Sequence, residues 1–264
     1  MGRFLLGLLF AAFVLFLYGP TLTIMLLSFG GPDSGLTFPM RGVSLHWFRE
    51  LLAPQAVGNL PAALRRSFAL ALMVTAATVC VSLAAGLAFR RRFRGAGLLF
   101  ALALASLIVP SLLVSLGVGL VWTQLGLDAE WWSSGFGAQL TWTLPFGLLI
   151  TFAVFNRFDR AWEEAARDAG ATPRQTFWLV VLPILLPPVV GIALFGFTLS
   201  WDEFARTLLT AGGSNTLPLE IYGMTGNVTS PVLYALGTVT TLVSLLAIGL
   251  SLLTVSLLAR RRSA

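Results

Sequence analysis

Long apolar stretches without Asp, Glu, Lys or Arg alternate with short charged segments along the 264 residues of the chain. Each apolar stretch exceeds the roughly 20 residues that a helix needs to cross the hydrocarbon core of a bilayer. The stretches are 4–32, 67–89, 95–127, 131–156, 175–201 and 221–259. The last is too long for one helix and begins with a polar, turn-rich part, so its helix is expected at about 236–259. The pattern predicts an all-α membrane protein with six transmembrane helices.

The first stretch has one feature of a secretory signal, because Arg3 precedes it. Its apolar run is too long for the core of a signal peptide, and it shows no convincing small-residue cleavage site. We therefore expect this stretch to be retained as the first transmembrane helix.

The arginines give the expected orientation of the chain, since all 17 basic residues are Arg. With the N-terminus inside, an excess of them falls on the inner side, as the positive-inside rule requires. The inner ones are Arg3, Arg90, Arg91, Arg92, Arg94, Arg157, Arg160, Arg167, Arg174, Arg260, Arg261 and Arg262, and the outer ones are Arg41, Arg49, Arg65, Arg66 and Arg206. Both termini are therefore expected in the cytoplasm, with the chain passing several times through a membrane.

Composition agrees with a membrane environment. The chain is 57% hydrophobic and 11% charged, with a mean hydropathy of +0.87, whereas soluble domains carry about a quarter charged residues. The net charge of +6 follows from the membrane orientation, so no nucleic-acid partner is expected. Cys80 and His46 are each the single residue of their kind, which predicts neither an internal disulfide nor a metal site.

The inner segment between the fourth and fifth stretches has the period of an amphipathic helix. Its apolar residues recur every three or four positions, and charged residues occupy the opposite face. The apolar set is Phe158, Ala161, Trp162, Ala165, Ala166 and Ala169; the charged set is Asp159, Arg160, Glu163, Glu164, Arg167 and Asp168. Arg160 with Glu164, and Glu163 with Arg167, are four residues apart and can form ion pairs.

The same segment carries signals that end one helix and start another. Gly170 stands where a left-handed residue would end the first helix. Thr172, Pro173 and Gln175 then form a capping box with proline at its preferred position. The second helix is expected to run into the membrane, where Pro183, Pro187 and Pro188 bend or interrupt it.

Two interpretations of the charged inner helix remain open on physical grounds. It can rest on the membrane surface, although such helices prefer a strongly basic polar face. It can also dock in a groove of another protein, which suits a face of mixed charge better.

The spacing of this segment resembles the EAA loop of binding-protein-dependent ABC importer permeases. Glu164, Ala165 and Ala166 are followed at the family spacing by Gly170 and by the Leu182–Pro183 pair, while Val180 stands where the family often has Ile. The resemblance implies the importer permease fold in a single domain, 1–264, with a core at about 60–259 and a coupling loop at 157–174. It also implies a multi-pass protein of the bacterial inner membrane, whose loop docks on a cytoplasmic ATPase. The residues implied in this coupling are Glu163, Glu164, Ala165, Ala166, Asp168, Gly170, Leu182 and Pro183.

A glycine-rich phosphate loop of the form G-x-x-x-x-G-K-[ST] does not occur in the sequence. We therefore expect ATP to be used by a separate subunit, with no cofactor bound and no catalytic residue in this chain.

The outer end of the fifth stretch carries two adjacent acids, Asp202 and Glu203. The simpler interpretation is that they are solvated beyond the lipid. The surrounding residues, however, resemble spermidine/putrescine permeases, in which Glu203 would replace a second Asp. The matching residues are Ser200, Asp202, Leu217, Pro218, Ile221, Tyr222, Ser230, Pro231, Ala235 and Leu236. The resemblance implies a polyamine cargo, with Ser200, Asp202, Glu203 and Tyr222 as candidates for its pathway; for Tyr222, packing on another protein or helix is the alternative.

Such an importer implies several partners besides membrane lipid: an ATPase dimer, a periplasmic binding protein and a second permease. We expect the second permease to be a distinct chain, with a homodimer as the alternative. Related permeases carry iron(III), thiamine or organophosphonates, so another small solute stays open. A secondary transporter is the alternative of a different class, but it would need buried ionisable residues that the apolar stretches lack. A scaffold protein would not need the capped inner loop.

Overall fold

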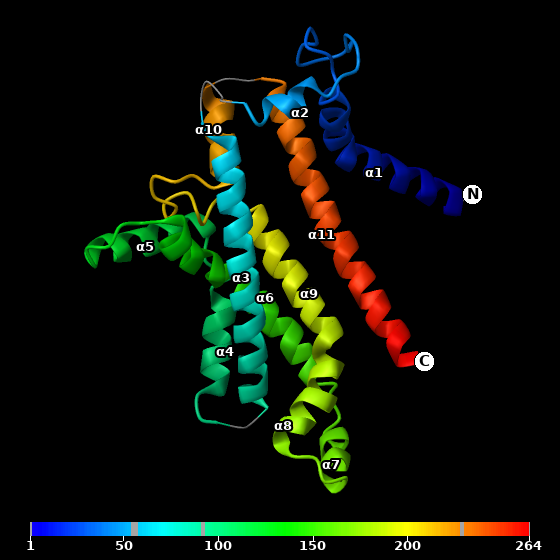
Figure 1. Cartoon of the computed structure of the whole chain (residues 1–264), viewed down its shortest axis with the longest axis vertical. Helices are drawn as coiled ribbons and strands as arrows, with labels where there is room; N and C mark the ends of the chain where they lie inside the picture. Colours follow the sequence, from blue (N-terminus) through cyan, green and yellow to red (C-terminus); the bar gives the residue numbers. More distant parts are fainter. Residues whose placement is uncertain (1, 54–57, 91–92, 228–229, 264) are drawn as a thin grey trace. The chain divides into compact units, whose positions relative to one another are not determined.

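The computed structural model describes residues 2–53, 58–90, 93–227 and 230–263 (Figure 1). Within these ranges the chain consists of helices and turns, with an isolated β-bridge between Gly30 and Val43, so the predicted all-α class is confirmed. Arg91 and Arg92, counted above among the inner arginines, lie outside the described residues.

Five helical segments of the described chain are long and apolar enough to cross a membrane. They are Gly2–Leu27, Leu60–Phe89, Trp131–Phe155, Pro173–Trp201 and Val232–Leu258. The third predicted stretch is instead divided into α4 (Ala96–Ala105) and α5 (Ser111–Gln124). The division falls at Pro110, which offers no amide hydrogen and disfavours helical backbone at the residue before it. The prediction of six full-length spans is therefore not confirmed.

Contacts divide the chain into two compact units, and the first comprises Met1–Ala62 and Glu220–Leu245. It holds α1 (Gly2–Leu27), α2 (His46–Glu50), most of α10 (Leu217–Asn227) and the start of α11 (Val232–Ser263). Helix α10 lies where the sequence predicted a turn-rich segment, and α11 starts before the expected residue 236.

A buried carboxylate organises part of this first unit. The Glu220 side chain on α10 accepts a hydrogen bond from the backbone amide of Asn59, directly before α3 (Leu60–Phe89). A carboxylate at this position satisfies an amide that the helix itself leaves unpaired and interacts favourably with the helix dipole.

The second unit comprises Ala63–Leu219 and Leu246–Ala264. Its centre is the pair α6 (Phe136–Phe155) and α9 (Leu182–Trp201), which pack against each other (Figure 1), and α3 contacts α6. The α3–α6 contact depends on small residues: Thr78 Oγ1 donates to Thr143 Oγ1 at 2.8 Å. A methyl group at Gly86 or Gly147 would overlap a side chain of the facing helix. Small residues of this kind let helix backbones approach closely in membranes.

The fifth predicted span is continuous from Pro173 to Trp201, through the short α8 (Pro173–Thr176), a π-helical turn η2 (Phe177–Val181) and α9. Three prolines, Pro183, Pro187 and Pro188, lie inside α9 without ending it. The irregular turn lies before them, at η2, so the sequence located the proline positions but not the π-helical turn.

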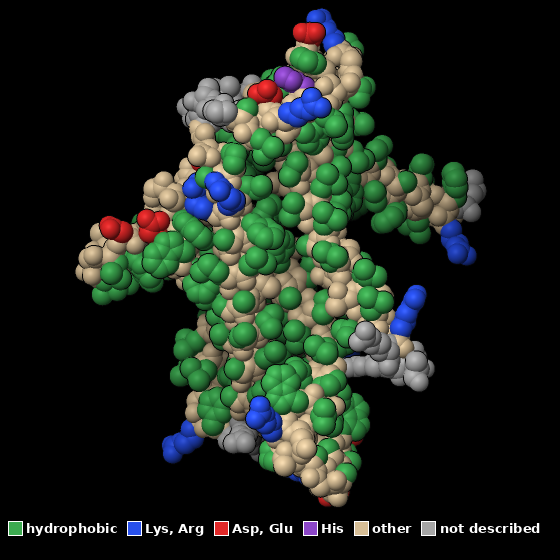
Figure 2. All heavy atoms as spheres, viewed as in Figure 1, with side chains coloured by type: hydrophobic (Ala, Val, Ile, Leu, Met, Phe, Trp, Pro, Cys, Tyr) green, Lys and Arg blue, Asp and Glu red, His purple; other side chains and the backbone are tan. Residues whose placement is uncertain are grey.

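The exposed surface of the chain is strongly apolar. Green hydrophobic side chains dominate the face seen in Figure 2, and charged side chains are sparse on it. Large hydrophobic residues are exposed along α1, α4 and α5 in particular. Water would disfavour such surface, whereas lipid or partner subunits would cover it.

Candidate functional site

The predicted helix–glycine–helix of the inner loop is confirmed in its local geometry. Helix α7 (Ala161–Asp168) begins three residues after Phe158, where the Asp159 carboxylate accepts the Ala161 amide at 2.9 Å. Gly170 follows with φ of +86°. The Gly170 amide donates to the Arg167 carbonyl at 2.8 Å, and the Ala171 amide donates to the Ala166 carbonyl at 3.0 Å. These two bonds form a Schellman motif, which satisfies the last carbonyls of α7.

The capping box after this turn is also confirmed. Thr172 Oγ1 accepts the Gln175 amide at 3.3 Å, and Gln175 Oε1 accepts the Thr172 amide at 2.8 Å. Pro173 occupies the first helical turn. Since both helix ends are satisfied locally, α7 keeps a defined direction relative to α8 and the start of α9.

The exposure of the two faces of α7 is the reverse of that expected for a helix that buries its apolar stripe within its own chain. The apolar face is largely uncovered: Trp162 is 47% exposed, and Ala161, Ala165 and Ala169 are exposed as well. Glu163 on the charged face is instead packed inside the chain, with a side chain 13% exposed. The chain itself therefore leaves the apolar face of α7 free to meet another surface.

The ion pairs of α7 are only partly as predicted. Glu163 Oε2 lies 3.8 Å from Arg167 Nη2, which confirms that pair. Arg160 does not pair with Glu164 in the described chain; its Nη2 donates to the Arg90 carbonyl at 3.0 Å. Glu164 is left exposed, as are Asp168 and Gly170. The remaining motif residues, Leu182 and Pro183, form the first turn of α9.

The outer candidates lie in different environments. Ser200 is buried and donates from Oγ to Gln139 Oε1 on α6, which joins α9 to α6. Asp202 follows the last residue of α9 and is exposed. Partial loss of hydration raises the pKa of its carboxyl above the ordinary value. Tyr222 belongs to the first unit and is exposed on α10.

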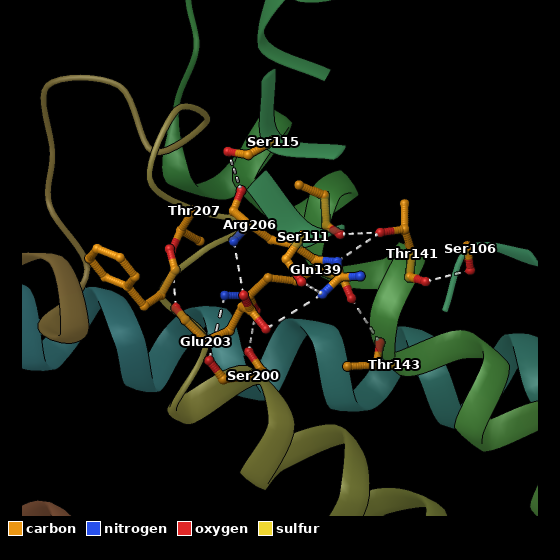
Figure 3. A network of polar contacts seen from close by, with 12 residues as sticks. Ser106, Ser111, Ser115, Gln139, Thr141, Thr143, Ser200, Glu203, Arg206 and Thr207 are labelled. Carbon is orange, nitrogen blue, oxygen red and sulfur yellow. Dashed lines mark hydrogen bonds and ion pairs between the residues drawn. The ribbon is translucent and has the colours of Figure 1, made fainter. Parts of the chain in front are cut away.

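Glu203 is held within a buried polar network around Arg206, shown in Figure 3. Its Oε1 accepts the Arg206 amide at 2.8 Å, and its Oε2 lies 3.8 Å from Arg206 Nη1. The guanidinium, whose residue is 1% exposed, also donates to Ser111 Oγ at 2.7 Å and Thr141 Oγ1 at 3.2 Å. Its Cζ lies 4.5 Å from the centre of the Trp142 ring, within the range of a cation–π interaction.

This network separates the two outer acids. Glu203 already has an internal cation beside it, so its charge is largely compensated. Asp202 has no such partner among the described ion pairs and is exposed. The two adjacent acids therefore have different surroundings, and both stay predicted candidates for the pathway.

Three charged residues with structural roles were not identified from the sequence: Arg90, Arg206 and Glu220. Glu203 and Arg206 are three positions apart, and this spacing indicates local pairing, so the sequence contained a signal for the role of Arg206. Arg90 is the first of a run of arginines, and the sequence does not show that it differs from the others. The long-range contact of Glu220 with Asn59 has no local signal.

Five membrane-length helices in the described part of the chain and the packing of α6 on α9 define a multi-pass α-helical membrane protein. Residues 78–263 match the family described as binding-protein-dependent transport system inner membrane component, and the chain belongs to that family. It is therefore a permease subunit of an ABC importer, located in the inner membrane, and a transport protein rather than an enzyme.

Two curated relatives match most of the chain. The spermidine/putrescine transport system permease protein PotC of Escherichia coli K12 is 29% identical over 250 residues, covering 94% of this chain and 92% of the relative. The putrescine transport system permease protein PotI of the same strain is 30% identical over 232 residues, covering 84% and 80%.

Solved structures with the same fold are importers. A chain of a bacterial ABC transporter involved in the import of the acidic polysaccharide alginate aligns with a TM-score of 0.65 at 18% identity, covering 96% of this chain and 95% of that one. An inward-facing MetNI methionine ABC transporter aligns with a TM-score of 0.59 at 16% identity, covering 74% and 94%. The predicted importer permease fold is thus confirmed.

Proposed function

We propose that this permease translocates polyamines and that α7 is the helix through which a separate ATPase drives it. The observation that carries the coupling role is the uncovered apolar face of α7 beside the exposed Glu164. An amphipathic helix with an apolar face and a few charged anchors is suited to docking in a protein groove. Ala165 and Ala166 keep that face shallow, so a partner surface can approach the helix closely.

The mechanism we infer is alternating access. ATP binding closes the ATPase dimer, α7 moves with it, and the spans open outward toward a loaded periplasmic binding protein; hydrolysis then resets the permease. The capped turn at Gly170 and the first turn of α9 at Leu182 and Pro183 lie on the chain path from α7 into the span that follows it. A rigid turn at this place would transmit the movement of α7 into α9.

Polyamines are proposed as cargo because the relatives named above transport putrescine and spermidine, and because the outer site keeps a free carboxylate. Asp202 can attract an ammonium group and replace part of its lost hydration. Ser200 and Glu203 would then shape the site through their bonds to Gln139 and Arg206. Another small solute, such as iron(III), thiamine or an organophosphonate, is the alternative cargo.

The assembly we propose contains this chain as one permease domain, 1–264, with a distinct second permease and two ATPase subunits. The described residues, with their five membrane-length helices, leave much apolar surface uncovered, which a second permease would partly cover. A homodimer would meet the same requirement and is the alternative.

Uptake of labelled spermidine and putrescine into vesicles that hold this chain and its co-expressed neighbours tests the proposal. We expect saturable uptake that requires ATP and this chain, with competition by the unlabelled polyamine. Uptake driven by an ion gradient without ATP would favour a secondary transporter. An ATPase that is bound and stimulated by a binding protein loaded with another solute would retain the importer and reject the polyamine cargo.

A further inference from the structure

Arg90 directly follows α3 and reaches the coupling helix α7. Its Nη1 donates to Glu163 Oε1 at 2.6 Å, although the two residues are 73 positions apart in the sequence. The two side chains are only 18% and 13% exposed, so this ion pair is shielded from water more than a surface pair. Such charge-assisted bonds are stronger and more directional than neutral hydrogen bonds.

Two aromatic rings hold the same guanidinium in place. Arg90 Cζ lies 5.3 Å from the centre of the Phe155 ring and 4.9 Å from that of Phe158. Both distances allow a cation–π interaction. Phe155 ends α6 and Phe158 lies in the turn before α7, so Arg90 contacts the coupling segment at its start as well as at Glu163.

A second hydrogen bond connects the two elements, with its donor on the coupling segment. Arg160 Nη2 donates to the Arg90 carbonyl at 3.0 Å. Carbonyls at the end of a helix lack partners within the helix, so this bond satisfies a group that α3 leaves open. The end of α3 and the coupling segment are therefore joined by side chains contributed from both sides.

The adjacent acids of α7 have different surroundings. Glu163 is largely buried and forms an ion pair with Arg90, whereas Glu164 is exposed and can contact another protein. Helix α7 also packs on α8 and η2, which are its own continuation along the chain. Arg90 is thus a cross-connection from α7 to a span that is distant in the sequence.

We propose that the Arg90–Glu163 pair is a positioning latch that makes the inner end of α3 move together with α7. The proposal rests on the coupling role proposed above. Without the latch, α7 would still dock on the ATPase through its uncovered face, but its movement would reach the membrane mainly through α9. Arg90 and Glu163 would then affect the yield of transport per ATP rather than the binding of the ATPase.

The test uses the complete importer, reconstituted in vesicles with its second permease, ATPase and binding protein. The variants are Arg90→Gln, Glu163→Gln and the double variant, with Arg94→Gln as matched control because Arg94 is an exposed arginine of the same segment. Solute uptake and ATP hydrolysis are measured in the same vesicles, with copurification of the ATPase as a separate readout.

We expect each single variant to retain the ATPase and to lower uptake per ATP by about 2- to 30-fold, the usual range for residues that carry coupling. The double variant should be no worse than the single ones, because both remove the same interaction. Arg94→Gln should match the wild type. Additive losses, wild-type yields in both single variants, or loss of ATPase binding in Glu163→Gln would each overturn the latch.

Poor membrane insertion of Arg90→Gln would still leave a decisive comparison. Glu163→Gln and Glu163→Asp keep every arginine, and Glu163→Asp retains the charge that Arg90 binds. We expect Glu163→Asp to recover part of the yield lost in Glu163→Gln, and equal yields would overturn the proposal. An ATPase that does not bind the wild-type permease would instead reject the coupling role itself, which distinguishes the two failures.

Discussion

Replacing Gly170 by Val tests whether the turn after α7 must be rigid. Gly170 has φ of +86°, and a Cβ built there would have no heavy atom within 4 Å. The substitution therefore creates backbone strain without a steric clash. A side-chain-bearing residue held in this conformation costs about 1–3 kcal/mol, and a β-branched one belongs at the upper end. That cost disfavours the native turn by a factor of roughly 5 to 150.

The strain should be relieved by loss of the two Schellman bonds, from Gly170 to Arg167 and from Ala171 to Ala166. We then expect α7 to lose its fixed direction, and ATPase stimulation by the loaded binding protein to fall in proportion. Gly170→Asn is the matched control, because Asn also adds a Cβ but tolerates the left-handed region. The assay is ATP hydrolysis of the reconstituted importer, with insertion measured in the same sample. Normal stimulation in Gly170→Val, or equal losses in both variants, would refute the reasoning.

The outer acids and the exposed tryptophan should respond differently. Asp202→Asn is expected to weaken cation uptake severalfold without affecting insertion. Because the pKa of Asp202 is raised, wild-type uptake should begin to fall on acidification at a higher pH than for an ordinary Asp. An unchanged pH profile of uptake in Asp202→Asn would contradict this. Glu203→Gln should instead lower stability by roughly 1–3 kcal/mol, seen as earlier thermal unfolding in detergent, because buried Arg206 loses its carboxylate; unaltered unfolding would reject that role. Trp162→Ala should weaken ATPase binding about tenfold or more in a pull-down titration. Trp178→Ala, on the apolar fifth span, should leave ATPase binding unchanged. Equal effects of the two substitutions would exclude docking through Trp162.

Local signals in the sequence predicted local structure well. The capping box at Thr172 and the glycine turn at Gly170 depend on neighbouring residues only, and both have the predicted geometry. The division of the third stretch was harder to predict, because one proline at residue 110 can either kink or end a helix. Helix α10 was missed because its polar residues and glycines resemble a loop.

The contacts of individual charges could not be predicted, since they depend on residues far away in the sequence. The helical period placed Glu163 and Glu164 on one face of α7, yet only Glu163 meets Arg90 from the end of α3. Likewise, Asp202 and Glu203 are adjacent, yet only Glu203 contacts Arg206. Equal charge at adjacent positions therefore indicates a polar face but does not indicate which charge remains available.

The close contact of α3 with α6 has a mechanical consequence. Ser82 and Gly86 on α3 face Gly147 and Thr151 on α6, so the two helices approach closely over about one helical turn, mostly through glycines and short side chains. Contacts between backbones and short side chains deform less than contacts between long, flexible ones. The two helices should therefore move as one rigid body, and a displacement of the inner end of α3 would displace both spans together.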